Sequence, residues 1–90
     1  MFKKGKIVVT RGVNEAICEN EKFSKEVLRS FIRYNCCDWG EMCDEDKETN
    51  NLALKSGERI FASYETCKGK IWIITEWDRS VTTVLFPSEY

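Results

Sequence analysis

The segment Lys70–Trp77 constrains the fold most, because it is apolar on both faces of the strand that its composition predicts. Ile71 and Ile73 would point to one side of a sheet, and Trp72 and Ile74 to the other. A two-layer fold covers only one of these sides. The sequence therefore predicts a central strand whose far side is shielded by the N-terminal arm and long side chains, or by a second molecule.

The strand belongs to a β-rich C-terminal third. Short turns separate it from two further segments of strand character, Arg59–Glu65 and Val81–Phe86. Strands joined by such short turns are antiparallel neighbours. Near the N-terminus, the β-branched segment Lys6–Thr10 predicts a fourth strand.

Helical patterns fill the middle of the chain. Asn20 is a suitable N-cap for a helix with an apolar stripe at helical spacing, and the short segment before it, Glu15–Glu19, predicts a turn. The stripe comprises Phe23, Val27, Leu28, Phe31 and Ile32. A second helix is expected from near Asp44 to just before Gly57, with Leu52–Leu54 as its thin buried side.

These elements predict one domain over residues 1–90, which is the size of a single small domain. The expected class is α+β with the order β-α-α-β-β-β, and the expected architecture is two helices packed on a curved antiparallel four-stranded sheet.

The composition argues against an enzyme. The chain has no histidine, which excludes histidine-based triads, acid–base pairs and metal ligands. No two glycines lie close enough for a phosphate-binding loop or a dinucleotide fingerprint. We therefore predict neither catalytic residues nor a cofactor. The 14 basic and 15 acidic residues nearly balance, which removes the strongest argument for non-specific binding to nucleic acid or a membrane.

Five cysteines and the absence of an export signal predict free thiols and a cytoplasmic protein. Cys36, Cys37 and Cys43 are close in sequence, so a metal ion bound by these thiols is the alternative hypothesis. The sequence has no C-x-x-C pair and no imidazole to complete a site, and we predict no metal.

An acidic stretch, residues 38–48, holds six acids and one base and predicts a docking surface for a basic partner protein. The alternative is a loop and a first helical turn enriched in acids that favour the helix dipole. The residues assigned to this surface are Asp38, Trp39, Glu41, Asp44, Glu45, Asp46 and Glu48.

Three tryptophans are many for this size, and tryptophan serves both as a core filler and as an interface anchor. We expect Trp72 or Trp39 to fill the core. Trp77, beside Arg79 at the end of a hairpin, is the better candidate for contact with a partner.

A basic cluster marks the other end of the charge distribution, at Lys3, Lys4, Lys6 and Arg11. It suggests contacts with phosphates, in a nucleic-acid-binding module that would also use aromatic side chains on the sheet face. The alternative is a solvated edge strand that its charges protect from aggregation.

Four stretches carry a resemblance to a known family: Val8–Asn14, Cys37–Glu41, Gly57–Phe61 and above all Lys70–Tyr90. Together they resemble a family of small proteins from Gram-positive gut and soil bacteria that are often carried on plasmids, integrative elements or prophages. Some members are labelled as a type I restriction methylase subunit. This chain lacks the cofactor-binding glycine motif and the Asn-Pro-Pro-aromatic motif of such a methylase. The resemblance therefore implies an association with defence systems and no methyl transfer.

The leading prediction is a non-enzymatic accessory protein of a mobile genetic element that binds one host or element-encoded protein. Its sharpest version is the inhibition of a defence nuclease, of the restriction or CRISPR type, by the acidic stretch. The second prediction is the nucleic-acid-binding module. A homodimer that buries the second face of the Lys70–Trp77 strand is the third.

Overall fold

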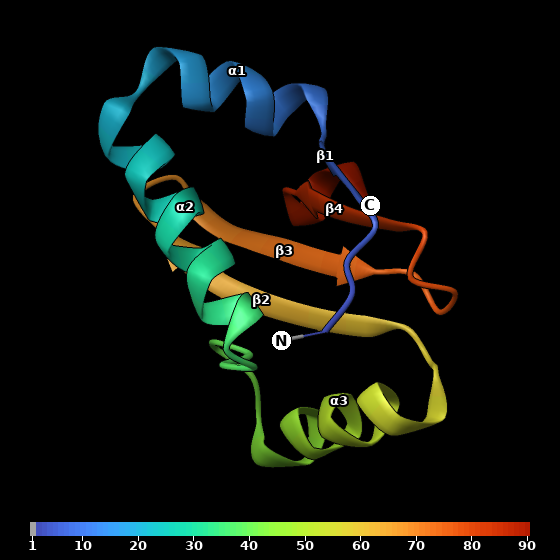
Figure 1. The fold of residues 1–90 in the computed structure, drawn as a ribbon. Coiled ribbons are helices and arrows are strands. Elements are labelled where there is room, and N and C mark those ends of the chain that lie inside the picture. The colour runs from blue at the N-terminus through green and yellow to red at the C-terminus, as the bar shows by residue number, and fades with distance from the viewer. Residues whose placement is uncertain (1) are drawn as a thin grey trace.

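The computed structural model describes residues 2–90, which form three helices, four strands and a short 3-10 helix (Figure 1). Along the chain, β1 and the three helices come first, and the remaining strands and η1 follow. Their bounds are β1 Lys6–Val9, α1 Arg11–Glu19, α2 Glu21–Asn35, α3 Asp44–Ser56, β2 Ile60–Thr66, β3 Gly69–Thr75, β4 Val81–Leu85 and η1 Pro87–Glu89.

The four strands form one sheet in the order β1-β4-β3-β2. Strands β2, β3 and β4 pair antiparallel as consecutive hairpins, as the sequence predicts. Strand β1 pairs parallel with β4, so the sheet is mixed, and the prediction of a wholly antiparallel sheet is wrong at this strand. The helices connect β1 to β2 at the far edge of the sheet, and the two hairpins then bring β4 back beside β1 in the parallel direction. The α+β class and the order of elements are confirmed.

The helices lie on one face of this sheet and at its β2 edge (Figure 1). Helix α2 begins after Asn20, whose side chain accepts a hydrogen bond from the Phe23 amide, as the sequence predicts. Its buried side holds Phe23, Val27 and Tyr34, which pack against the sheet. The predicted stripe is therefore correct in part, because Leu28 and Ile32 stay exposed.

Helix α1 replaces the short turn that the sequence predicts at Glu15–Glu19. It begins at Arg11, and a carboxylate near the C-terminus of the chain caps its first turn. Glu89 accepts hydrogen bonds from the Thr10 hydroxyl and from the Gly12 amide, at 2.5 and 2.9 Å. A capping acid 77 residues away in sequence is invisible to local pattern analysis.

The outer face of the sheet, turned away from α2, is covered by the C-terminal segment. The Trp72 ring packs edge-on against Phe61 and Tyr90, with ring centroids 4.9 and 5.7 Å apart. The predicted shielding by the N-terminal arm is wrong, because Phe2 packs on the other side of the sheet, against Tyr34 and Trp39. The chain itself thus covers much of the second apolar face of β3.

A chain of buried hydroxyl groups joins α2 to three separate segments. The Tyr34 hydroxyl lies 2.7 Å from the Thr75 hydroxyl, which lies 2.7 Å from that of Thr82. Thr82 in turn donates to the carbonyl of Lys4. Burial raises the pKa of the Tyr34 phenol above its usual value of 10.0, so this hydroxyl stays protonated further into the alkaline range than an exposed tyrosine does.

The outer edge of β2 is closed by the chain that follows α2. Ser63 accepts a hydrogen bond from the Glu41 amide and donates its own amide to the Trp39 carbonyl. This close approach needs a glycine at position 40. The φ of Gly40 is +79°, and a Cβ at this position would clash with the Ser63 carbonyl oxygen and the Tyr64 ring.

We predict that Gly40→Ala destabilises the fold by about 2 kcal/mol more than Gly57→Ala does. Both glycines have a left-handed backbone, with φ of +79° and +76°, so both variants carry the same backbone strain. Only the Gly40 variant also forces a methyl group into packed atoms, because a Cβ at Gly57 meets nothing. Urea unfolding of both variants measures the difference, and equal midpoints would contradict the steric argument.

A second prediction concerns the cap on α1. Hydrogen bonds from Thr10, and from the amides of Phe86 and Gly12, lower the pKa of Glu89 below its ordinary value of 4.5. Its ionised form therefore stabilises the fold above pH 4.5, and this contribution is lost as the pH falls through the lowered pKa. Glu89→Gln should cost about 0.5 kcal/mol at pH 7, and the difference should shrink below pH 4. A pH-independent difference in Tm would refute this cap.

Candidate protein-binding groove

An open apolar groove lies between the helices and the edge strand β1. In the parallel register Ile7 pairs with Thr82 and Val9 with Val84, and paired residues share a face of the sheet. Thr82 and Val84 are buried beneath the helices, so Ile7 and Val9 also face the helical side. Yet Ile7 and Val9 remain 46% and 38% exposed, because the open groove separates them from α1 and α2.

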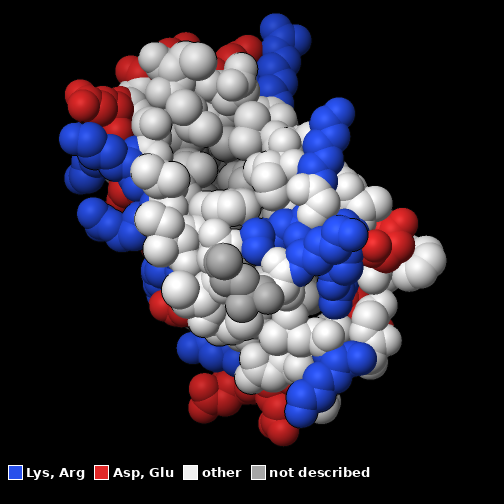
Figure 2. All heavy atoms as spheres, viewed as in Figure 1, with Lys and Arg blue, Asp and Glu red and all other residues white. Residues whose placement is uncertain are grey.

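The groove has a volume of about 360 Å³ and is lined mainly by aliphatic and aromatic side chains. Figure 2 shows the hollow between α1, α2 and the N-terminal strand. Leu28 stands on its rim and is 62% exposed. The lining residues on the helices are Ile17, Ser24, Lys25, Val27, Leu28 and Phe31.

The free edge of β1 runs along this groove. The amides of Lys6 and Thr10 donate to carbonyls of Ser80 and Val84, as parallel pairing with β4 requires. The amides and carbonyls of the alternate residues, Ile7 and Val9, therefore point away from β4 toward the open edge. Both residues thus offer an exposed apolar side chain and an outward-facing peptide group.

The opposite edge of the sheet offers no such opening. Besides the bridge at Gly40, the side-chain amide of Asn50 on α3 bonds both the carbonyl and the amide of Phe61, at 2.6 and 3.1 Å. Asn50 is buried, and its side-chain amide makes the two backbone hydrogen bonds with Phe61 that a neighbouring strand would otherwise make. The two edges of the sheet therefore differ: β2 is sealed by polar contacts and β1 is open.

The groove lies in a basic environment. Residues 2–14 carry four basic and no acidic side chains, and Lys25 lines the groove itself. In Figure 2, basic side chains border the hollow on both sides, and acidic ones lie among them on the α1–α2 side. Lys25 itself pairs with Glu21 at 3.5 Å. Two of the predicted phosphate contacts are already engaged, since Lys4 donates to the Phe2 carbonyl and Arg11 pairs with Glu15. Lys3 and Lys6 are exposed.

The six acids of the predicted acidic surface are exposed, but they form two groups: two lie beside Arg33 and four lie on α3. Asp38 accepts two hydrogen bonds from Arg33, which lower the pKa of its carboxyl group. Glu41 lies 4.0 Å from the same guanidinium group. The other four acids stand in and just after the first turn of α3 and face solvent: Asp44, Glu45, Asp46 and Glu48.

Trp39 does not belong to this surface. It is 2% exposed, and its indole nitrogen donates to the Asn51 side chain at 3.0 Å. Assigning it to partner contact is therefore wrong, and the expectation of a core tryptophan is correct for Trp39. Trp72 is only partly buried.

Trp77 and Arg79 lie in the β3–β4 turn and have different surroundings. Trp77 is 67% exposed and free to touch a partner. The guanidinium of Arg79 donates to the carbonyls of Ala53 and Glu58, at 2.9 and 2.7 Å, and so fixes the turn to the end of α3. We therefore assign Arg79 a structural role. Because Ala53 is nine residues beyond Asp44 along α3, this turn and the acids of the first turn lie about 14 Å apart along the helix axis and form no single site.

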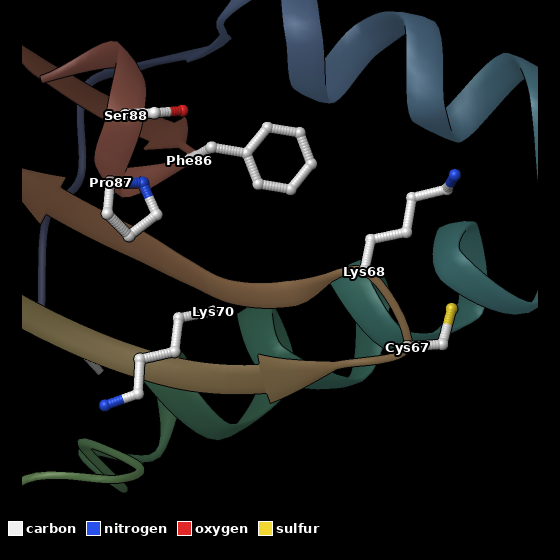
Figure 3. A pocket seen from close by; sticks show the side chains of 6 residues that line it. All are labelled: Cys67, Lys68, Lys70, Phe86, Pro87 and Ser88. Carbon is white, nitrogen blue, oxygen red and sulfur yellow. The ribbon is translucent and has the colours of Figure 1, made fainter.

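A further hollow, beside the β2–β3 turn, does not have the form of a binding site. It is wide and open, and Figure 3 shows the amines of Lys68 and Lys70 pointing away from each other. Cys67 on its rim is a free thiol, as are the other four cysteines. Among residues 2–90, no cluster of three or more cysteine or carboxylate side chains is placed to hold a metal ion.

Comparison of the chain with protein-family models, with curated proteins and with solved structures finds no match. In the part of the chain that the structure describes, no helix combines the length and hydropathy required to cross a bilayer. The resemblance to mobile-element proteins stays a prediction.

Proposed function

We propose that this protein is a non-enzymatic accessory protein that acts by binding another protein, and that the groove beside β1 is its binding surface. The observation that carries the proposal is the exposure of apolar side chains, from both β1 and α2, beside an unpaired strand edge. Contiguous apolar surface with a polar rim is typical of protein interfaces.

The chemistry of the groove favours a protein over a small ligand. Sites for small molecules usually enclose the ligand and aim several polar groups at it. Here the lining offers one hydroxyl and one amine from side chains, at Ser24 and Lys25, and the hollow is open along its length. A catalytic role for the groove would need an acid–base pair, which its described lining does not contain.

The test places a photo-reactive amino acid, benzoylphenylalanine, at Leu28 or at Leu52. These two leucines are matched, since both stand on helices and are 62% and 60% exposed, but only Leu28 lines the groove. Irradiation of cells that make each variant should give a strong protein adduct from position 28. Position 52, which lies one helical turn beyond Glu48 of the acidic surface, should give a weaker adduct or none. Equal adducts at both positions, or adducts with nucleic acid alone, would overturn the proposal.

We further propose, from the resemblance, that the partner belongs to a defence system and that the acidic surface competes there with nucleic acid. The exposure of all six acids supports this version. In a restricting or CRISPR-carrying strain, the protein should raise the yield of transformants with a targeted plasmid relative to the same strain without the protein.

Neutralising Asp38, Glu41, Asp44, Glu45, Asp46 and Glu48 to the amides should abolish this gain. A control variant that neutralises Glu19, Glu21 and Glu65, which are exposed elsewhere, should retain it. Because acids near the start of α3 also favour its dipole, the Tm of both variants is measured first. A fully active six-fold variant would exclude the acidic surface and leave the groove as the site.

A further inference from the structure

We propose that the groove takes an extended segment of the partner protein, rich in alternating apolar and acidic residues, which adds to the sheet as a strand beside β1. This inference rests on the proposed function and specifies the chemistry of the bound segment. Strand addition to an open sheet edge is a recurring mode of peptide recognition, in which backbone hydrogen bonds give affinity and side-chain pockets give specificity.

The backbone of β1 supplies the first argument. The amide and carbonyl groups of Ile7 and Val9 point away from β4, while the amides of Lys6 and Thr10 donate to carbonyls of Ser80 and Val84 within the sheet. An added strand would satisfy the outward groups without disturbing the existing ladder. A helix lying in the groove could not do so, because its own backbone groups bond internally.

The side chains supply the second argument. Ile7 and Val9 face the groove, and the residues of a neighbouring strand that lie opposite them must face it too. Every second residue of the bound segment would therefore contact the apolar wall formed by Leu28 and Phe31. The residues between them would lie on the other face, beside Lys6 and Val8.

Charge decides the identity of those intervening residues. In the edge segment, residues 2–14, Lys3 and Lys6 are exposed and no residue is acidic, so acidic residues of the bound strand beside them would face opposite charge. Pairing of β1 with β1 of a second copy would instead bring together two edges that both carry basic side chains and no acidic one. Lysine on an edge strand opposes such self-association. The complementary occupant is thus an acidic segment of another protein.

The decisive variant is Val9→Pro. Proline removes the outward amide of residue 9 but leaves the Lys6 and Thr10 amides, and hence the pairing with β4, in place. The matched variant Val9→Ala keeps the amide and loses most of the apolar side chain. Lys6→Glu reverses one charge on the outer face. Circular dichroism and Tm establish that all three variants fold.

The probe is a library of random peptides displayed on phage, selected against the purified full-length chain and counter-selected against Leu28→Glu. We expect enriched peptides with apolar residues at every second position and acids between them. Their synthetic versions should bind Val9→Pro about tenfold or more weakly than Val9→Ala, because one peptide carbonyl loses its donor. Lys6→Glu should weaken binding by about threefold to tenfold. Bound peptide should also slow hydrogen exchange at the Ile7 and Val9 amides.

Three results would overturn the inference: enriched peptides that are basic or have helical spacing, equal binding to the proline and alanine variants, or a dimer of the free chain that Val9→Pro abolishes. The last result would assign the edge to a second copy. Adducts from position 28 that persist in the Val9→Pro chain would leave the proposed function standing while the strand model fails. The absence of protein adducts from that position would instead remove the proposed function itself.

Discussion

The parallel pairing of β1 with β4 is the interaction on which the rest of this structure depends. It joins the first strand of the chain to the last, and it places Lys4 where its carbonyl accepts from Thr82. It also brings Thr10 to the C-terminal segment, so that Glu89 can cap α1. Without this pairing, α1 would lose its cap and the groove its floor and one wall.

The same pairing makes the sheet asymmetric. Asn50 and the chain around Gly40 seal the β2 edge, whereas β1 ends the sheet with two unpaired peptide groups and two exposed aliphatic side chains. Exposed strand edges are usually blunted by charge or covered, because they pair with other chains. Here the lysines discourage self-pairing, and an acidic strand would find both hydrogen-bond partners and opposite charge. We regard this asymmetry as the feature that links fold to function.

Local patterns predicted the hairpins and α2 well, because turns, alternation and the cap at Asn20 act over a few residues. They failed where a partner is distant. Helix α1 depends on Glu89, and the burial of Trp39 depends on the packing of Phe2 and Tyr34 around it. The acids were correctly expected at the surface, since charged side chains near a helix start are solvated. The groove was missed because Ile7, Val9 and Leu28 look like ordinary core residues in sequence.

The sequence by itself determined the α+β class, the order of the elements, the absence of histidine chemistry and the polarised placement of charge. These follow from composition and from spacings within a helix or strand. Only the tertiary structure decided which apolar residues stay exposed, which edge of the sheet is open, and that Arg79 is committed to main-chain carbonyls. The physical reason is that burial and strand pairing are set by residues far apart along the chain, and no local pattern records where β1 meets β4.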